Sequence, residues 1–243
     1  AWFFECIKQI KDLDLCDFVL IVKNSSPKKS VLRKIWEKRR NLIYFLHNKL
    51  DNFIFSPKPD AFSLRNIMGI LDGTSVLETN PIQSRYKDTI PNEDIEKINS
   101  YNIDIIIRGG FRILEGEILK VPKYGIWSYH HGDNRVNRGS PPGFWETVTD
   151  SPTTGMMIQI INNNLDGGNV LIRSSLSTNK YSITLNKNNL YWSSASLLSI
   201  KLREFHNIGP KKFFENVAGE GKATAERIAI VTEVDEKIRG ETA

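Results

Sequence analysis

The chain has 243 residues, of which 40% are hydrophobic and 25% are charged, and its formal net charge is +5. These values are typical of a globular protein with a sizeable core. No apolar run approaches the ~18 residues that a membrane span needs, so we expect no membrane partner. The positive charge would suit an anionic partner such as a phosphorylated substrate, a nucleotide or RNA, but a solvated basic surface accounts for it better.

Only two cysteines are present, Cys6 and Cys16, and we interpret them as thiols of a cytoplasmic protein rather than as a disulfide. The sequence shows no signal-peptide pattern. It begins at Ala1 without a methionine, so an upstream targeting segment stays open.

The first part of the chain predicts a helix, a strand and a second helix. In residues 2–13 the spacing of Phe3, Ile7 and Ile10 predicts an amphipathic helix, and the apolar run at 17–22 predicts a strand covered on both faces. Residues 31–50 read as a basic helix. Its expected inner side chains are Ile35, Leu42, Phe45 and Leu46.

The rest of the chain alternates short buried strands with helices. Residues 51–92 look irregular, with one short strand at S-V-L-E-T-N. Asn92 is the expected N-cap of the next helix. The remaining expected elements are a helix at 92–101, strands at 103–107 and 125–129, a short helix at 142–149, strands at 154–161 and 169–174 joined by L-D-G-G, and a helix at 194–206 with Leu197, Leu198, Ile200, Leu202 and Phe205 inside.

This order predicts an α/β fold with a Rossmann-like, mostly parallel sheet and helices on both faces. A doubly wound domain opens on a strand, whereas this chain opens on a helix, so we expect a first strand to be missing. We assign residues 1–217 to this domain. Residues 218–243 read as a loosely ordered tail, which could hold one strand or helix turn, or as the start of a further segment.

The candidate chemistry lies in loops that follow apolar runs. His130 ends the run G-I-W-S-Y and stands beside His131, while Asp166 lies in the glycine turn L-D-G-G. A carboxylate at such a turn can orient an imidazole or take a proton. By itself L-D-G-G would be only a hairpin turn. A metal site built from both histidines, Asp133 and Asp166 is the weaker interpretation, because neighbouring strand residues point in opposite directions.

Three motifs in order resemble the formyltransferases that use 10-formyltetrahydrofolate. They are Ser128-Tyr129-His130, then Arg138-Gly139 about eight residues later, then Leu165-Asp166-Gly167-Gly168. Upstream, the segment G-G-F-R-I-L at 109–114 is similar to the loop that lines the pterin pocket in that family. Ser128 stands where the family carries an asparagine that binds the formyl oxygen.

The resemblance implies roles for individual residues. His130 would stabilise the tetrahedral intermediate, Asp166 would polarise the imidazole, and Ser128 would replace the asparagine; no metal is implied. The pterin and the rest of the folate would contact Asp166 and Gly110, Phe111, Arg112, Ile113 and Leu114. The acceptor would contact His131, Asn134 and Arg138, with Arg135 and Asn137 as further candidates for phosphate contacts.

The expected function is transfer of a formyl group from 10-formyltetrahydrofolate to a primary amine of a small molecule, most plausibly a nucleotide-linked amino sugar. We prefer the sugar because the carboxyl-terminal domain of the tRNA enzyme is not evident, and we expect no nucleic-acid partner. A methionyl-tRNA formyltransferase-like activity is the runner-up. Two other functions are alternatives. One is a weakened formyltransferase-like binding domain, with Ser128 as the sign of lost activity. The other is an unrelated nucleotide-binding module, and the sequence argues against it because it has neither a G-x-G-x-x-G nor a P-loop motif. A homodimer stays open.

Overall fold

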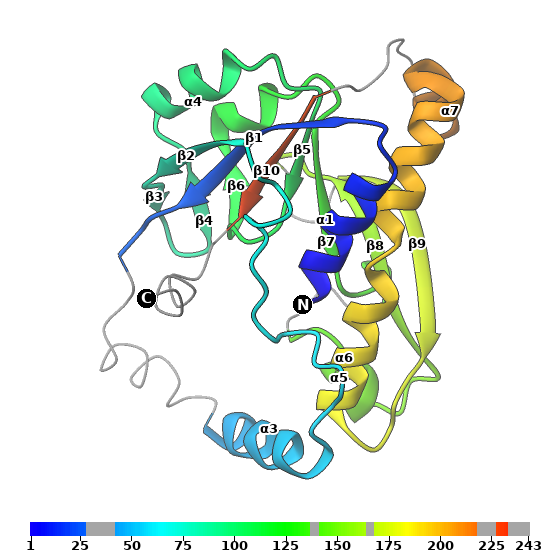
Figure 1. Ribbon diagram of the computed structural model, residues 1–243. Helices are drawn as coiled ribbons and strands as arrows, with labels where there is room; N and C mark the ends of the chain where they lie inside the picture. The colour runs from blue at the N-terminus through cyan, green and yellow to red at the C-terminus, as the bar shows by residue number, and fades with distance from the viewer. Residues whose placement is uncertain (28–41, 137–140, 164–167, 218–226, 233–243) are drawn as a thin grey trace.

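A mostly parallel sheet forms the centre of the protein (Figure 1). The computed structural model describes residues 1–27, 42–136, 141–163, 168–217 and 227–232. The seven strands run in the order β2-β1-β10-β5-β7-β8-β9, parallel from β2 to β7 and antiparallel for β8 and β9. Their bounds are β1 Asp17–Asn24, β2 Ser75–Thr79, β5 Ile105–Arg108, β7 Ile126–His130, β8 Thr153–Ile160, β9 Asn169–Ser177 and β10 Arg227–Thr232. The Rossmann-like α/β prediction is confirmed.

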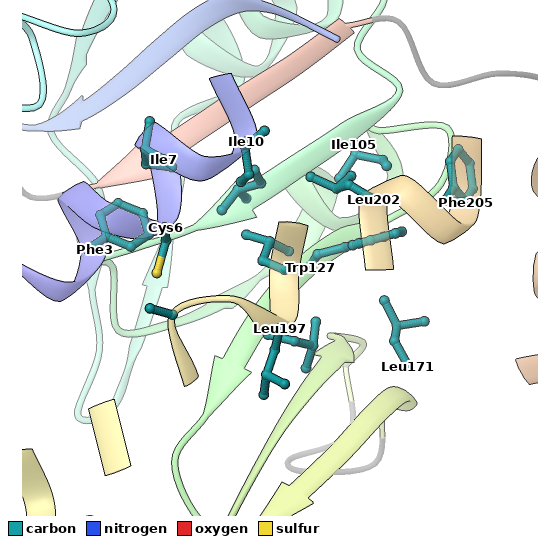
Figure 2. Close-up of a cluster of buried hydrophobic side chains, with 14 of the residues drawn as sticks. Phe3, Cys6, Ile7, Ile10, Ile105, Trp127, Leu171, Leu197, Leu202 and Phe205 are labelled. Atoms are coloured by element: carbon teal, nitrogen blue, oxygen red, sulfur yellow. The ribbon is translucent and has the colours of Figure 1, made fainter. Parts of the chain in front are cut away.

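Helices cover both faces of this sheet, as the apolar strands require. The helical elements are α1 Trp2–Asp12, α3 Leu42–Phe55, α4 Asn92–Asn99, the 3-10 helix η2 Gly116–Lys120, α5 Phe144–Val148, α6 Ile183–Ser194 and α7 Leu197–Val217. One core cluster packs α1, α6 and α7 on the sheet, and Figure 2 shows Trp127 of β7 between side chains of α1 and α7. The second cluster packs α4 and η2 on the opposite face.

The first helix has the buried face that its sequence predicts. Phe3, Ile7 and Ile10 are all buried, and Cys6 lies among them. Both cysteines are unpaired thiols, as expected. Gly109, at the end of β5, is needed at this contact, because a Cβ there would stand 2.2 Å from the ring of Phe3. The helix is therefore packed directly against the loop that follows β5.

The small second sheet was not predicted. It pairs β3 Ile82–Gln83, β4 Lys87–Thr89 and β6 Ile113–Glu115 in the order β3-β4-β6. Strands of two or three residues are too short to show the alternation that identifies a strand in a sequence. The short strand expected at S-V-L-E-T-N is confirmed as β2.

Three details of the helix predictions are wrong. The N-cap of α4 is Pro91, not Asn92, because Pro91 has an extended ψ of 144° and its carbonyl accepts hydrogen bonds from Asp94 N and Ile95 N. The helix expected at 194–206 is the start of the longer α7, which bends at Gly209-Pro210. Ile200, expected inside, is 40% exposed.

Helix α3 is attached by a buried polar contact and by the ring of Tyr44, which packs edge to face on Phe144 of α5, and not by the expected inner face. Residues 31–41 of the expected basic helix lie outside the described residues. Leu42 and Leu46 were expected inside but are 57% and 59% exposed. The buried residue of α3 is Asp51, whose carboxylate accepts hydrogen bonds from Ser182 Oγ at 3.0 Å and Thr184 N at 2.7 Å. This contact joins α3 to the first turn of α6.

Strand β10 occupies the middle of the sheet. It pairs in parallel with β1 on one side and with β5 on the other. The single strand that the sequence analysis left open in this tail is present as β10, and the backbone of residues 227–232 hydrogen-bonds to strands on both sides. The rest of that tail, 218–226 and 233–243, lies outside the described residues. Because β10 fills the place between β1 and β5, the sheet is continuous although the chain opens on a helix.

Candidate functional site

The candidate site lies where two neighbouring parallel strands end. β5 ends at Arg108 and β7 ends at His130, and the two strands are hydrogen-bonded in parallel. Ligands of open α/β sheets bind outside the carboxyl ends of the strands. The sequence placed His130 at a strand end, and this placement is confirmed.

Two cavities meet at this edge. The larger has a volume of about 550 Å³, and its lining includes Tyr86, Ile113, Leu114, Gln159, Ile161 and Gly168. The smaller has a volume of about 380 Å³, and its lining includes Trp2, Gly109, Gly110, Phe111, His131 and Tyr191. Three residues, Arg108, Tyr129 and His130, line both. These three side chains form the boundary at which a molecule in one cavity would meet a molecule in the other.

Arg108 is the positive charge at this boundary. Its Nε donates to Arg112 O at 3.0 Å, its Nη1 to Ser128 Oγ at 2.9 Å and its Nη2 to Phe111 O at 2.5 Å. Burial lowers the pKa of its guanidinium, and the charge of Asp88 opposes this effect. A guanidinium stays protonated at neutral pH. The site thus holds a fixed cation at the end of β5, which the sequence analysis did not select.

Ser128 lies beneath the site rather than on its surface. Its side chain is buried, accepts from Arg108, and donates through its Oγ to the backbone oxygen of Tyr129 at 3.2 Å. It does not appear among the residues that line either cavity. Its expected catalytic role stays a prediction.

The segment 109–114 divides between the two cavities. Gly110 and Phe111 line the smaller cavity, whereas Ile113 and Leu114 line the larger. Phe111 and Leu114 also belong to the second core cluster.

Arg112 lines neither cavity and instead holds the small sheet together. Its Nε and Nη2 donate to Asp88 Oδ1 at 2.9 Å and 2.6 Å, and its backbone N donates to Asp88 Oδ2 at 3.0 Å. Asp88 is fully buried. The expected folate contact of Arg112 stays a prediction, whereas its ion pair with Asp88 is observed.

His131 stands in a stack of rings in the wall of the smaller cavity. Its imidazole lies 3.7 Å from the ring of Tyr191, nearly parallel to it, and 5.1 Å from the ring of Trp2, edge to face. Its Nε2 lies 3.0 Å from Ser194 Oγ. Burial, with the nearby charges of His130 and Lys187, lowers its pKa to about 3. His131 is therefore a neutral imidazole at physiological pH.

The loop after His131 carries an exposed ion pair. Arg135 Nη2 lies 2.6 Å from Asp133 Oδ2, and this contact lowers the pKa of Asp133 to about 2. Asn134 Oδ1 accepts from Arg173 Nη2 at 3.3 Å. None of these three loop residues lines either cavity, so the expected acceptor contact of Asn134 stays a prediction.

The three remaining predicted residues, Asn137, Arg138 and Asp166, lie outside the described residues. Gly168, the last residue of L-D-G-G, is described. A Cβ at this position would stand 2.0 Å from the carbonyl oxygen of Ile160, so only glycine fits between β8 and β9. This close approach brings the start of β9 to the larger cavity.

Several lining residues could not be found by reading the sequence. Trp2 and Tyr191 come from α1 and α6, far from the motifs in sequence, and only the packing of both helices on the sheet brings them to His131. Arg108 did carry a signal, since a charged residue that ends a buried apolar run must lie at a sheet edge. In the described part of the chain, no group of three or more His, Cys, Asp or Glu side chains could hold a metal ion. A search of those same residues found no helix long and apolar enough to cross a bilayer.

Sequence comparison finds relatives among the methionyl-tRNA formyltransferases. The chain is 34% identical over 102 residues to the enzyme of Prochlorococcus marinus, and 31% identical over 98 residues to that of Clostridioides difficile. These matches cover 41% and 40% of this chain and 30% of each relative. The aligned part thus spans less than a third of the length of these relatives. No protein-family model matches the chain.

Structure comparison finds solved formyltransferases as well. Phosphoribosylglycinamide formyltransferase from Campylobacter jejuni has a TM-score of 0.48 at 14% identity, with 78% of this chain and 97% of that chain covered. The formyltransferase PseJ from Anoxybacillus kamchatkensis has a TM-score of 0.36 at 14% identity, with 91% of this chain and 89% of that chain covered.

Proposed function

Because the chain is a relative of the formyltransferases, we propose that it transfers a formyl group from 10-formyltetrahydrofolate to a primary amine. The observation that carries this proposal is the position of His130, on the boundary between two cavities. A transfer between two substrates needs one reacting group within reach of both. One cavity would hold the formyl donor and the other the amine.

We assign the larger cavity to the folate. A pteridine is a flat heteroaromatic ring system with polar edges, and ligand pockets for such molecules combine apolar walls with a few polar groups. Ile113, Leu114 and Ile161 supply apolar surface, while Gln159 supplies an amide. The volume of about 550 Å³ lies within the range of small-molecule sites.

The proposed reaction is a direct transfer. The amine nitrogen attacks the formyl carbon and forms a new C–N bond, and the carbonyl oxygen becomes an oxyanion. The bond between the formyl carbon and N10 of the folate then breaks, N10 takes a proton, and the attacking nitrogen loses one. His130 can carry a proton between these nitrogens, because it lines both cavities. Asp166 is its proposed partner on the strength of the L-D-G-G resemblance.

For the acceptor we propose a nucleotide-linked amino sugar in the smaller cavity. Trp2, His131 and Tyr191 give this cavity an aromatic wall. Burial raises the pKa of Tyr191 to about 12, so its phenol keeps its proton. A flat aromatic wall with a phenol donor suits the apolar face of a sugar ring or a base. In keeping with the two unpaired cysteines, we place the reaction in the cytoplasm.

A second acceptor is favoured by the sequence relatives, which are methionyl-tRNA formyltransferases. Under this alternative the smaller cavity would hold the methionyl end of a charged tRNA. The basic net charge of +5 is compatible with either acceptor.

The test is a transfer assay with 10-formyltetrahydrofolate and two sets of acceptors, nucleotide-linked amino sugars and methionyl-tRNA. We expect release of tetrahydrofolate that depends on a sugar amine. Release that depends only on methionyl-tRNA would replace the sugar proposal with its alternative. Folate binding without transfer to any amine would support the weakened binding domain. If the protein shows neither folate binding nor transfer, the proposed function is overturned.

A further inference from the structure

Gln159, which lines the larger cavity, has a buried amide oxygen without a hydrogen-bond partner in the described part of the chain. The residue is 6% exposed, and its Oε1 has no hydrogen-bond partner among the described residues. Leaving a buried polar atom unpaired is unfavourable, so native proteins rarely keep one without a reason. Its place in the cavity wall points to a ligand as the missing partner.

The sheet places Gln159 in a row with the groups around His130. Arg108 of β5 is paired with Ser128 of β7, and Ser128 is paired with Gln159 of β8. Residues paired across neighbouring strands point to the same face of a sheet. His130 follows Ser128 by two residues and shares that face. Arg108, Ser128, Gln159 and His130 therefore form one polar group on one face of the sheet.

Within this group, the hydroxyl hydrogen of Ser128 is already used in a hydrogen bond. Its hydroxyl has one hydrogen, which it donates to Tyr129 O at 3.2 Å, and its oxygen accepts from Arg108. A guanidinium has five N–H groups. Three of those of Arg108 are used in its contacts with other described residues, and no contact within the described ranges takes the other two. Within this polar group, Arg108 thus has two N–H groups that no contact between described residues takes, and Gln159 adds its amide NH₂.

We propose that the carboxamide of Gln159 donates to the formyl oxygen of the bound folate, with a remaining N–H of Arg108 as the second donor. This inference rests on the proposed function. Negative charge develops on that oxygen as the amine attacks, and donors fixed in a buried site stabilise it strongly. A half turn about the last side-chain bond places the NH₂ where the unpaired oxygen lies, so that position then needs an acceptor such as the formyl oxygen. The donor role expected of Ser128 then passes to its neighbour across the β7–β8 pair.

The probes are 10-formylfolate and folate, which differ only in the formyl group. Isothermal titration calorimetry gives the ratio of their dissociation constants for each variant. For the wild type we expect the formylated ligand to bind more than about tenfold more tightly, because two donors meet the formyl oxygen. In Gln159→Met, which keeps the side-chain length and removes the amide, we expect this ratio to fall about tenfold, since one neutral hydrogen bond supplies a factor of this order. The turnover number should fall about 100-fold.

Two further variants separate donation from other roles. Gln159→Glu keeps the acceptor oxygens and removes the donor, so it should lower the ratio as Gln159→Met does. Gln83→Met is the matched control, since Gln83 is exposed on β3 and lines neither cavity. It should keep the wild-type ratio, and thermal unfolding would verify that all three variants fold.

The outcomes are distinct. A wild-type ratio retained in Gln159→Met, or in Gln159→Glu, would overturn the donor role of Gln159 while leaving the proposed function in place. If the affinities for both ligands fall equally, the amide contacts the pterin and not the formyl group. This result would also overturn the donor role of Gln159. If the wild type binds neither ligand, the proposed function itself fails, and the inference with it.

Discussion

The two cavities that meet at His130 are built in different ways. The wall of the larger is fixed by an ion pair between the buried carboxylate of Asp88 and the half-buried Arg112, which joins β4 to the residue before β6. The wall of the smaller is fixed by stacked rings from helices and a loop, centred on His131. Because different segments build the two walls, we expect that each can be altered without changing the other. Variants can therefore separate donor binding, acceptor binding and transfer.

The largest effect is expected where the cavities meet. His130→Ala should lower the turnover number about 10²- to 10⁴-fold, because the proposed proton carrier is lost, while leaving the folate affinity nearly unchanged. Steady-state kinetics with a calorimetric folate titration would measure both. His206→Ala, at an exposed histidine of α7, is the matched control. Turnover close to the wild-type value in His130→Ala would remove His130 from the mechanism.

The wall of the larger cavity should be the next most sensitive. Asp88→Ala removes a fully buried carboxylate and leaves Arg112 without its partner, so we expect about 3 kcal/mol of lost unfolding free energy and weaker folate binding. Denaturant unfolding would measure the first quantity. Glu117→Ala breaks the exposed pair with Lys120 and should cost under about 1 kcal/mol. Similar losses in the two variants would contradict the structural role of the buried pair.

The wall of the smaller cavity should make stability depend on pH. The pKa of His131 is lowered to about 3 in the folded protein, so between that value and the unfolded pKa of about 6.5 the unfolded state binds more protons. The contribution of the neutral His131 to the free energy of unfolding is fully present above about pH 6.5 and is lost as the pH falls toward 3. Between pH 8 and 5.5 we expect a loss of about 1.4 kcal/mol. Urea titrations should show that His131→Phe removes this part of the dependence; an unchanged slope would contradict it.

The smallest effects should fall on one substrate at a time. Tyr191→Leu removes the ring that stacks on His131 and should raise the KM of the acceptor about fivefold, since an aromatic contact contributes about 1 kcal/mol. Ile113→Ala should instead weaken folate binding by a similar factor. Initial-rate kinetics with each substrate varied would measure both. If both variants affect both substrates equally, the separation of the cavities is wrong.

Much of the frame follows from patterns in the sequence. The apolar runs around Ile105, Ile126 and Ile158 predicted the strands correctly. The polar residues that follow the run at 126–129 placed His130 at the end of a strand, where the structure has it. Of the L-D-G-G segment, Gly168 is described, and its close approach to Ile160 shows why glycine is required at that position. These features are local, so a short stretch of sequence contains their cause.

The rest depends on contacts between distant segments. Gln159 reads as an ordinary residue of a strand, and only the pairing of β8 with β7 places it beside Ser128. Leu46 fits an inner helix face by its spacing, yet α3 is held by the polar contact of Asp51, so that face stays exposed. Trp2 meets Tyr191 because two helices pack on one side of the sheet. Spacing along the chain contains none of this information.

The location of β10 has a consequence for synthesis on the ribosome. Residues 227–232 are made after every other described strand, yet they bond to both β1 and β5. Until they emerge, the nascent protein carries two incomplete half-sheets whose facing strands expose unpaired backbone groups to other chains. A chaperone that shields β1 and β5 during this interval would raise the yield of folded protein without touching the mature molecule.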